Sequence, residues 1–200
     1  EALRGDGHEI SRLDLGGGLG IPYTRSNEAP PLPVEYGAMI ERELGHLGCE
    51  IEIEPGRLIA GNAGILVSEV IYLKEGEGRN FLILDAAMND LIRPAMYEAH
   101  HDIVPVIEPE AGLEQSPLDI VGPVCESGDT FAKGRMMPAL GPGDLVAFRS
   151  AGAYGAVMSS EYNTRALIPE VLVKGDQFAV IRRRPSFEEI INRDSLPEWL

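Results

Sequence analysis

Lysine, cysteine and long apolar runs are scarce in this sequence, and each shortage limits what the protein can be. No apolar run approaches the roughly 20 residues that a membrane-spanning helix needs, so we expect no membrane segment. Two cysteines, Cys49 and Cys125, are too few for a disulfide framework, so we expect two free thiols. Since the opening residues carry no signal-peptide pattern, we expect a cytoplasmic protein.

Basic residues are also in the minority, and the charge balance argues against several partners. The chain has 17 Lys and Arg against 32 Asp and Glu, a net charge of −15. Such a surface repels phosphate backbones and anionic lipid headgroups, so we expect no nucleic-acid or membrane partner. His100 and His101 are adjacent, so they cannot face one metal ion from a helix and would diverge on a strand. We therefore expect no metal site.

Glycine and proline are abundant, with 23 and 15 residues, which favours strands and tight loops over a helical bundle. Between Ile10 and Gly56 the pattern predicts a strand, a glycine loop, a helix and a second strand, in the segments "ISRLDLGGG", "VEYGAMIERELGHLG" and "CEIEIEPGR". The helix has apolar residues three and four apart, so we expect one buried face. This order is a βαβ unit with parallel strands.

The pattern changes to β hairpins after Ala60. Antiparallel strands are predicted in "GILVSEVIYLKEGEGRNFLILDAAM", "PGDLVAFRSAGAY" and "PEVLVKGDQFAVIRRR". Ser186 and Glu189 form a capping box before a short helix. We therefore expect residues 1–60 to be an α/β part and 61–200 a β domain. One βαβ unit cannot bury both faces of its strands, so more α/β structure must come from further chain or from a partner.

Two loops at strand ends carry candidate binding residues. The segment "LDLGGGLG" can bring backbone amides close to a phosphate, because glycine has no Cβ; a plain tight loop is equally consistent. Glu54, Gly56 and Arg57 in "IEIEPGR" follow the next strand, where α/β barrels place their active sites. A surface salt bridge is the alternative role for Arg57.

The β part adds a second group of candidates. Arg93 and Tyr97 are four residues apart, so a helical turn would put both on one side, where they suit a carboxylate. The alternative is an exposed arginine with a packed tyrosine. Cys125 lies in the glycine-flanked segment "GPVCESGD", where a thiol on a loop can meet a ligand and exchange a proton near neutral pH. Its acidic neighbours Glu126 and Asp129 favour the acid role over the nucleophile.

The chain as a whole resembles the diaminopimelate decarboxylases, pyridoxal-phosphate enzymes with an alanine-racemase-like barrel. The resemblance rests on "LDLGGGLGIPY", "EPGR", "MNDLIRPAMYEAHHDIVPV", "GPVCESGD" and "SAGAYGAVMSSEYN". It implies the C-terminal half of the enzyme: the last part of a (β/α)8 TIM barrel followed by an antiparallel β-barrel or β-sandwich domain. The implied reaction is decarboxylation of meso-2,6-diaminopimelate to L-lysine and CO2.

The resemblance also implies a role for each candidate residue. The cofactor, pyridoxal 5'-phosphate, would be held by Gly18 and by the turn Glu54, Pro55, Gly56 and Arg57, with Glu54 at the ring nitrogen. Tyr154 would contact cofactor or substrate. The substrate would be bound at its carboxylate by Arg57, Arg93 and Tyr97 and at its ammonium by Glu126. Cys125 would return a proton to the carbon that loses CO2, in the active site of the partner subunit of a homodimer.

One expected residue is missing from the resemblance. The family binds its cofactor through a barrel lysine, whereas Lys74, Lys133 and Lys174 all follow the barrel part. We therefore expect a missing N-terminal barrel segment to supply that lysine, and the isolated chain to be inactive.

Three alternatives stay open. An ornithine-, lysine- or arginine-type decarboxylase is the nearest, although two arginines and a tyrosine favour a substrate with a second carboxylate. A catalytically silent homologue that binds a partner would not need Cys125, Glu126, Arg57 and Arg93 together. In a barrel enzyme with a flavin or a nicotinamide cofactor at the glycine loop, the segment "CESGD" would have no evident role.

Overall fold

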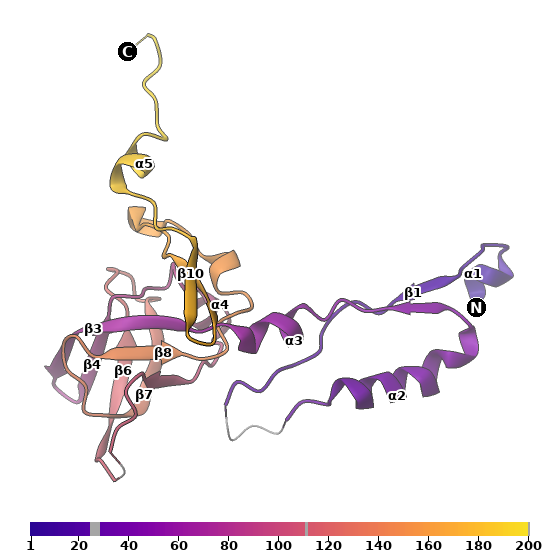
Figure 1. Ribbon diagram of the computed structural model, residues 1–200, viewed down its shortest axis with the longest axis horizontal. Coiled ribbons are helices and arrows are strands. Elements are labelled where there is room, and N and C mark those ends of the chain that lie inside the picture. Colours follow the sequence, from indigo (N-terminus) through magenta and orange to yellow (C-terminus); the bar gives the residue numbers. More distant parts are fainter. Residues whose placement is uncertain (25–28, 111, 200) are drawn as a thin grey trace.

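A computed structural model describes residues 1–24, 29–110 and 112–199 of the chain (Figure 1). Its first part contains α1 (Ala2–Gly5), β1 (Arg12–Asp14), α2 (Pro33–Leu44), η1 (Gly45–Leu47), β2 (Glu50–Glu52), α3 (Gly56–Ala60) and η2 (Gly61–Ala63). Strands β1 and β2 pair in parallel, from Arg12 opposite Glu50 to Asp14 opposite Glu52. Gly48 ends the helical segment with a left-handed φ of 59°. The predicted βαβ order is confirmed.

The prediction of a buried helix face is wrong for this chain. No residue of α2 is buried, and Val34 and Met39 are exposed. Figure 1 shows α2 and the β1–β2 pair extending away from the main sheet, to which α3 joins them. Two short strands offer too little surface to cover an amphipathic helix, so its apolar stripe stays open within the described residues.

The core lies in a six-stranded sheet with the order β5-β8-β3-β4-β6-β7. Its strands are β3 (Leu66–Gly76), β4 (Arg79–Leu84), β5 (Ile103–Pro105), β6 (Gln115–Val121), β7 (Thr130–Pro138) and β8 (Leu145–Phe148). The predicted hairpin of β3 and β4 is confirmed and turns at Glu77 and Gly78. Val70, Leu82 and Phe148 are among its fully buried side chains.

The sheet is mixed rather than antiparallel throughout, which corrects the expected β architecture. Strands β4 and β6 pair in parallel, from Asn80 opposite Leu118 to Ile83 opposite Val121. Parallel neighbours need a crossover connection, and the chain makes it through α4 (Arg93–Tyr97) and β5. The TIM-barrel half of the expected fold stays a prediction, because the described part of residues 1–60 forms one βαβ unit with short flanking helices.

The C-terminal elements follow the predicted turn and cap. Strands β9 (Glu170–Lys174) and β10 (Gln177–Arg182) form the expected antiparallel hairpin after the short turns η3 (Ala156–Met158) and η4 (Tyr162–Thr164). Helix α5 (Phe187–Ile191) begins with the capping box of Ser186 and Glu189. None of the helices in the described ranges is long and apolar enough to cross a membrane.

Candidate active site

A cavity of about 390 Å³ lies where the carboxyl ends of β1 and β2 meet the loop that follows β8. It brings together candidates from both halves of the sequence. Its lining consists of Gly17, Gly18, Leu19, Gly20, Glu54, Gly56, Arg57 and Tyr154.

Close backbone contact shapes the glycine loop of this cavity. The Glu54 N–H donates to the carbonyl of Gly16 over 2.8 Å, which continues the parallel pairing past the strand ends. A Cβ at Gly17 would lie 2.6 Å from the carbonyl oxygen of Glu54, so only glycine fits there. Gly18 has a left-handed φ of 93° and open space at its Cβ position. The loop therefore leaves bare backbone facing the cavity, as a phosphate cradle requires.

Arg57 lies between two aromatic rings. Its guanidinium carbon is 5.4 Å from the ring centroid of Tyr154 and 5.9 Å from that of Tyr23. Tyr154 adopts a left-handed φ of 59°, which is unfavourable for a tyrosine. Its segment is tied to the first part of the chain, since the Gly152 N–H donates to the carbonyl of Gly61 over 3.0 Å. The two cation–π contacts hold Arg57 at the cavity wall.

Arg93 is buried beside the same tyrosine. The side chain is 6 % exposed, and its guanidinium carbon lies 4.9 Å from the Tyr23 centroid. Its Nη1 lies 2.9 Å from Nε2 of His101. Burial, and secondly the charge of Arg93, lower the pKa of His101. Tyr97 lies on the same helix, α4, but is 61 % exposed. The two residues of the predicted pair are therefore on one helix, but only Arg93 is buried.

Tyr23 and His101 are the residues that sequence reasoning missed. From the sequence, His101 is considered only as a metal ligand; the side chain is 2 % exposed and hydrogen-bonds the buried Arg93. Tyr23 stood inside the motif "GIPY" without a role. Their contact is an edge-on ring pair with centroids 5.6 Å apart. Because it joins segments far apart in the chain, no local spacing could predict it.

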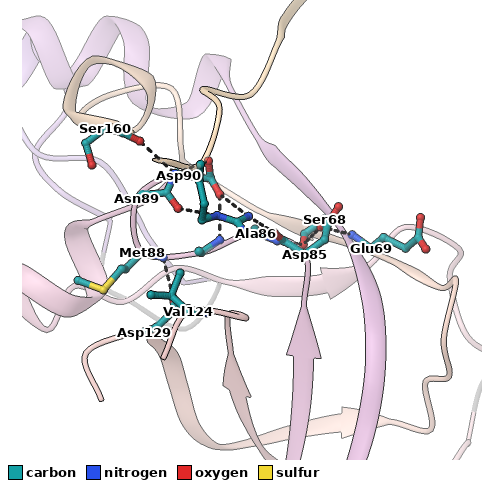
Figure 2. Close-up of polar contacts among 12 residues, drawn as sticks. Ser68, Glu69, Asp85, Ala86, Met88, Asn89, Asp90, Val124, Asp129 and Ser160 are labelled. Atoms are coloured by element: carbon teal, nitrogen blue, oxygen red, sulfur yellow. Dashed lines mark hydrogen bonds and ion pairs between the residues drawn. The ribbon is translucent and has the colours of Figure 1, made fainter. Parts of the chain in front are cut away.

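The loop that carries Cys125 and Glu126 connects β6 to β7 and is fixed by Asp129. The Asp129 carboxylate, 2 % exposed, accepts hydrogen bonds from the N–H groups of Met88 at 2.6 Å and Val124 at 2.7 Å (Figure 2). Burial raises the pKa of Asp129. Cys125 and Glu126 are both exposed, and neither lines the cavity of their own chain.

Met88, Asn89 and Asp90 link this loop to the segment that follows Tyr154 (Figure 2). The amide of Asn89 donates to the carbonyl of Ser160 over 3.0 Å, and the Ser160 N–H returns a bond of 2.9 Å. Asp90 accepts from the Ala87 N–H over 2.9 Å, and burial raises its pKa. The first residues of the motif "MNDLIRP" thus join the Cys125 loop to the segment around Ser160.

Comparison with known proteins decides which family has this arrangement. Residues 14–152 match the family described as pyridoxal-dependent decarboxylase, C-terminal sheet domain. The chain belongs to the pyridoxal-dependent decarboxylases. It is 48% identical over 199 residues to the diaminopimelate decarboxylase of Zymomonas mobilis, covering 100% of this chain and 47% of that protein. For that of Haemophilus influenzae the identity is 51% over 191 residues, covering 95% and 45%.

Solved structures of this decarboxylase family have the same fold. The diaminopimelate decarboxylase of Helicobacter pylori complexed with L-lysine aligns with a TM-score of 0.87 at 39% identity, covering 96% of this chain and 46% of that one. The enzyme of M. jannaschii in co-complex with L-lysine aligns with a TM-score of 0.90 at 34% identity, covering 100% and 46%. The chain spans about half the length of the relatives it matches.

The cavity fits pyridoxal phosphate, the cofactor of this family of decarboxylases. The bare glycine loop is suited to a phosphate, and the Glu54 carboxylate is exposed at the same cavity. None of the three lysines lines it: Lys74 lies in β3, Lys133 in β7 and Lys174 in β9. The lysine expected to bind the cofactor is therefore not at this wall of the site.

Proposed function

We propose that the protein containing this chain decarboxylates meso-2,6-diaminopimelate to L-lysine and CO2 with pyridoxal phosphate, as a cytoplasmic homodimer. One observation carries the proposal: the guanidinium groups of Arg57 and Arg93 both lie against the ring of Tyr23. Within the described part of the chain, neither arginine has an acidic partner. Two such cations suit a substrate that carries a second carboxylate.

The residues of the cavity divide the work of binding and orientation. Gly18 and the turn from Glu54 to Arg57 would hold the cofactor phosphate, and the Glu54 carboxylate would pair with the ring nitrogen of the cofactor. Bound there, the cofactor supplies an electron sink for the bond to the departing carboxylate. Tyr154 covers the cavity from the β domain. Arg57, Arg93 and Tyr97 hold the carboxylate that stays on the product.

The remaining two residues act in the partner's site. Glu126 binds the distal ammonium of the substrate, and the Cys125 thiol returns a proton to the carbon that has lost CO2. Both are exposed on a loop held by the buried Asp129 and are absent from the cavity lining of their own chain. This separation supports a site that two subunits share.

A substrate panel tests the proposal. The purified full-length enzyme with pyridoxal phosphate should release CO2 and lysine from meso-2,6-diaminopimelate, with a kcat/KM at least about 100-fold above those for ornithine, lysine and arginine. The reason is that those substrates lack the second carboxylate, so Arg57 and the buried Arg93 would be left without it. Equal turnover of ornithine would favour the ornithine-type alternative. Cofactor binding without turnover of any of the four would favour a silent homologue.

A further inference from the structure

Among the residues that the structure describes, the side chain of Arg93 is held by uncharged groups only. Its side chain is 6 % exposed, yet its contacts are the imidazole of His101 and the ring of Tyr23. No carboxylate of the described residues lies within ion-pair distance. Burying a guanidinium without a counter-ion is unfavourable unless a bound anion pairs with its charge. The described residues therefore keep a positive charge here that none of them neutralises.

His101 can serve Arg93 only as a neutral ring. Its Nδ1 lies 2.9 Å from the carbonyl oxygen of Arg149, which can only accept, so Nδ1 carries the proton. Nε2 then has a free lone pair and accepts from Nη1 of Arg93, which can only donate. A protonated ring would place two donors against each other. The lowered pKa of His101 agrees with this neutral tautomer.

Tyr23 places a second uncharged surface against both arginines. Its ring centroid lies 4.9 Å from the guanidinium carbon of Arg93 and 5.9 Å from that of Arg57. The negative face of an aromatic ring attracts a cation without cancelling its charge. The hydroxyl is buried and has no hydrogen-bond partner within the described chain. The ring, rather than the hydroxyl, makes the contacts with the arginines.

We propose that Tyr23 and His101 are positioning residues that hold Arg57 and Arg93 with neutral contacts, so that both positive charges remain available to the distal carboxylate of the substrate. The inference rests on the proposed function, in which these arginines bind that carboxylate. An acidic residue in place of either one would orient the arginines equally well but would compete with the substrate. Neutral contacts orient them without that competition.

The test compares charged and neutral replacements in the full-length holoenzyme, with L-lysine as the ligand in calorimetric titrations. L-Lysine keeps the distal carboxylate, whereas cadaverine lacks it. His101→Gln keeps a donor and an acceptor, so its Kd for L-lysine should stay within about 3-fold of wild type. His101→Glu should raise that Kd about 10-fold or more, because its carboxylate occupies Arg93. The Kd for cadaverine should not rise in either variant.

Two further variants separate charge from loss of contacts. His101→Leu loses both hydrogen bonds without adding charge, so it should weaken L-lysine binding less than His101→Glu. Tyr23→Phe keeps the ring and should bind L-lysine within about 2-fold of wild type, while Tyr23→Leu should bind about 2- to 30-fold more weakly. If His101→Glu does not fold, the comparison of Tyr23→Phe with Tyr23→Leu tests the positioning role.

The outcomes also separate this inference from the function on which it rests. If Arg93→Gln leaves the Kd for L-lysine unchanged, Arg93 does not bind the carboxylate and that part of the proposed function is wrong. If Arg93→Gln weakens binding while Tyr23→Leu and His101→Glu bind like wild type, only the positioning role is wrong. Equal losses for L-lysine and cadaverine would indicate general structural damage and would also overturn it.

Discussion

The carboxylate of Asp129 accepts a hydrogen bond of 2.6 Å from the backbone N–H of Met88 and so ties the loop of Cys125 to the segment that leads into Arg93 (Figure 2). The other carboxylate oxygen accepts from the Val124 N–H over 2.7 Å, next to the thiol. One buried side chain thus sets the position of the proposed proton donor relative to the rest of the β domain.

Asp129→Asn should destabilise the protein. The amide keeps one accepting oxygen and turns its NH2 group toward a second N–H, so a buried donor loses its partner at a cost of about 1–3 kcal/mol. Thermal unfolding of the full-length enzyme should show a lower Tm. Asp176→Asn is the matched control, since Asp176 lies exposed in the turn between β9 and β10. An unchanged Tm for Asp129→Asn would mean that the two bonds contribute nothing.

Gly122→Ala should displace the same loop. A Cβ at Gly122 would lie only 2.6 Å from the carboxyl carbon of Asp129, so the side chain or the loop must move. We expect a lower Tm together with reduced kcat. Gly141→Ala is the control, because nothing lies within 4 Å of its Cβ position. Wild-type values for both variants would show that the loop adapts without loss.

Stability should depend on pH through His101. Its pKa is lowered from 6.5, so on acidification the unfolded chain takes up the proton first. The contribution of the neutral ring is complete above pH 6.5 and is lost as the pH falls from there through the folded pKa. When the pH is lowered from about 8 to about 5, the Tm of the wild-type protein should decrease more than the Tm of His101→Gln. Parallel curves would contradict a lowered pKa of His101.

Cys125→Ala should lower kcat about 10²- to 10⁴-fold with a much smaller effect on substrate binding, because it removes a general acid. Cys125→Ser should recover little, since a hydroxyl is a far weaker acid than a thiol. Cys49→Ser is the control at the other free thiol, which is half-buried and accepts a hydrogen bond of 3.1 Å from Arg4. The Cys49→Ser enzyme should have a wild-type kcat. Near-normal turnover by Cys125→Ala, with lysine as the sole product, would remove the thiol from the mechanism.

Mixing two inactive variants tests the shared site. In a mixed dimer of Arg57→Ala and Cys125→Ala, one site carries both defects and the other carries neither. Random mixing should therefore restore about a quarter of wild-type activity, while each variant alone stays inactive. Native mass spectrometry should verify that mixed dimers form. If they form and remain inactive, each subunit works with its own Cys125.

Several elements of the fold could be read from the sequence because their signals are local. The parallel β1–β2 pair, the hairpins of β3–β4 and β9–β10 and the cap of α5 each follow from residue spacing or turn chemistry within a short segment. The glycine loop around Gly17 is also a local pattern, and its phosphate-binding role stays a prediction. Strands β6 and β7 escaped prediction, because Pro117 and Gly134 interrupt their apolar patterns.

The amino-acid sequence by itself thus determined the βαβ unit, two hairpins, a helix cap, the motifs and the types of residue available for chemistry. The tertiary structure alone decided that β4 and β6 run parallel, that α2 lacks a cover in this chain and that Tyr23, Arg93 and His101 meet. The physical reason is distance along the chain. Periodicity, turns and caps depend on neighbouring residues, whereas a buried arginine finds its partners only when the crossover from β4 to β6 has brought remote segments together.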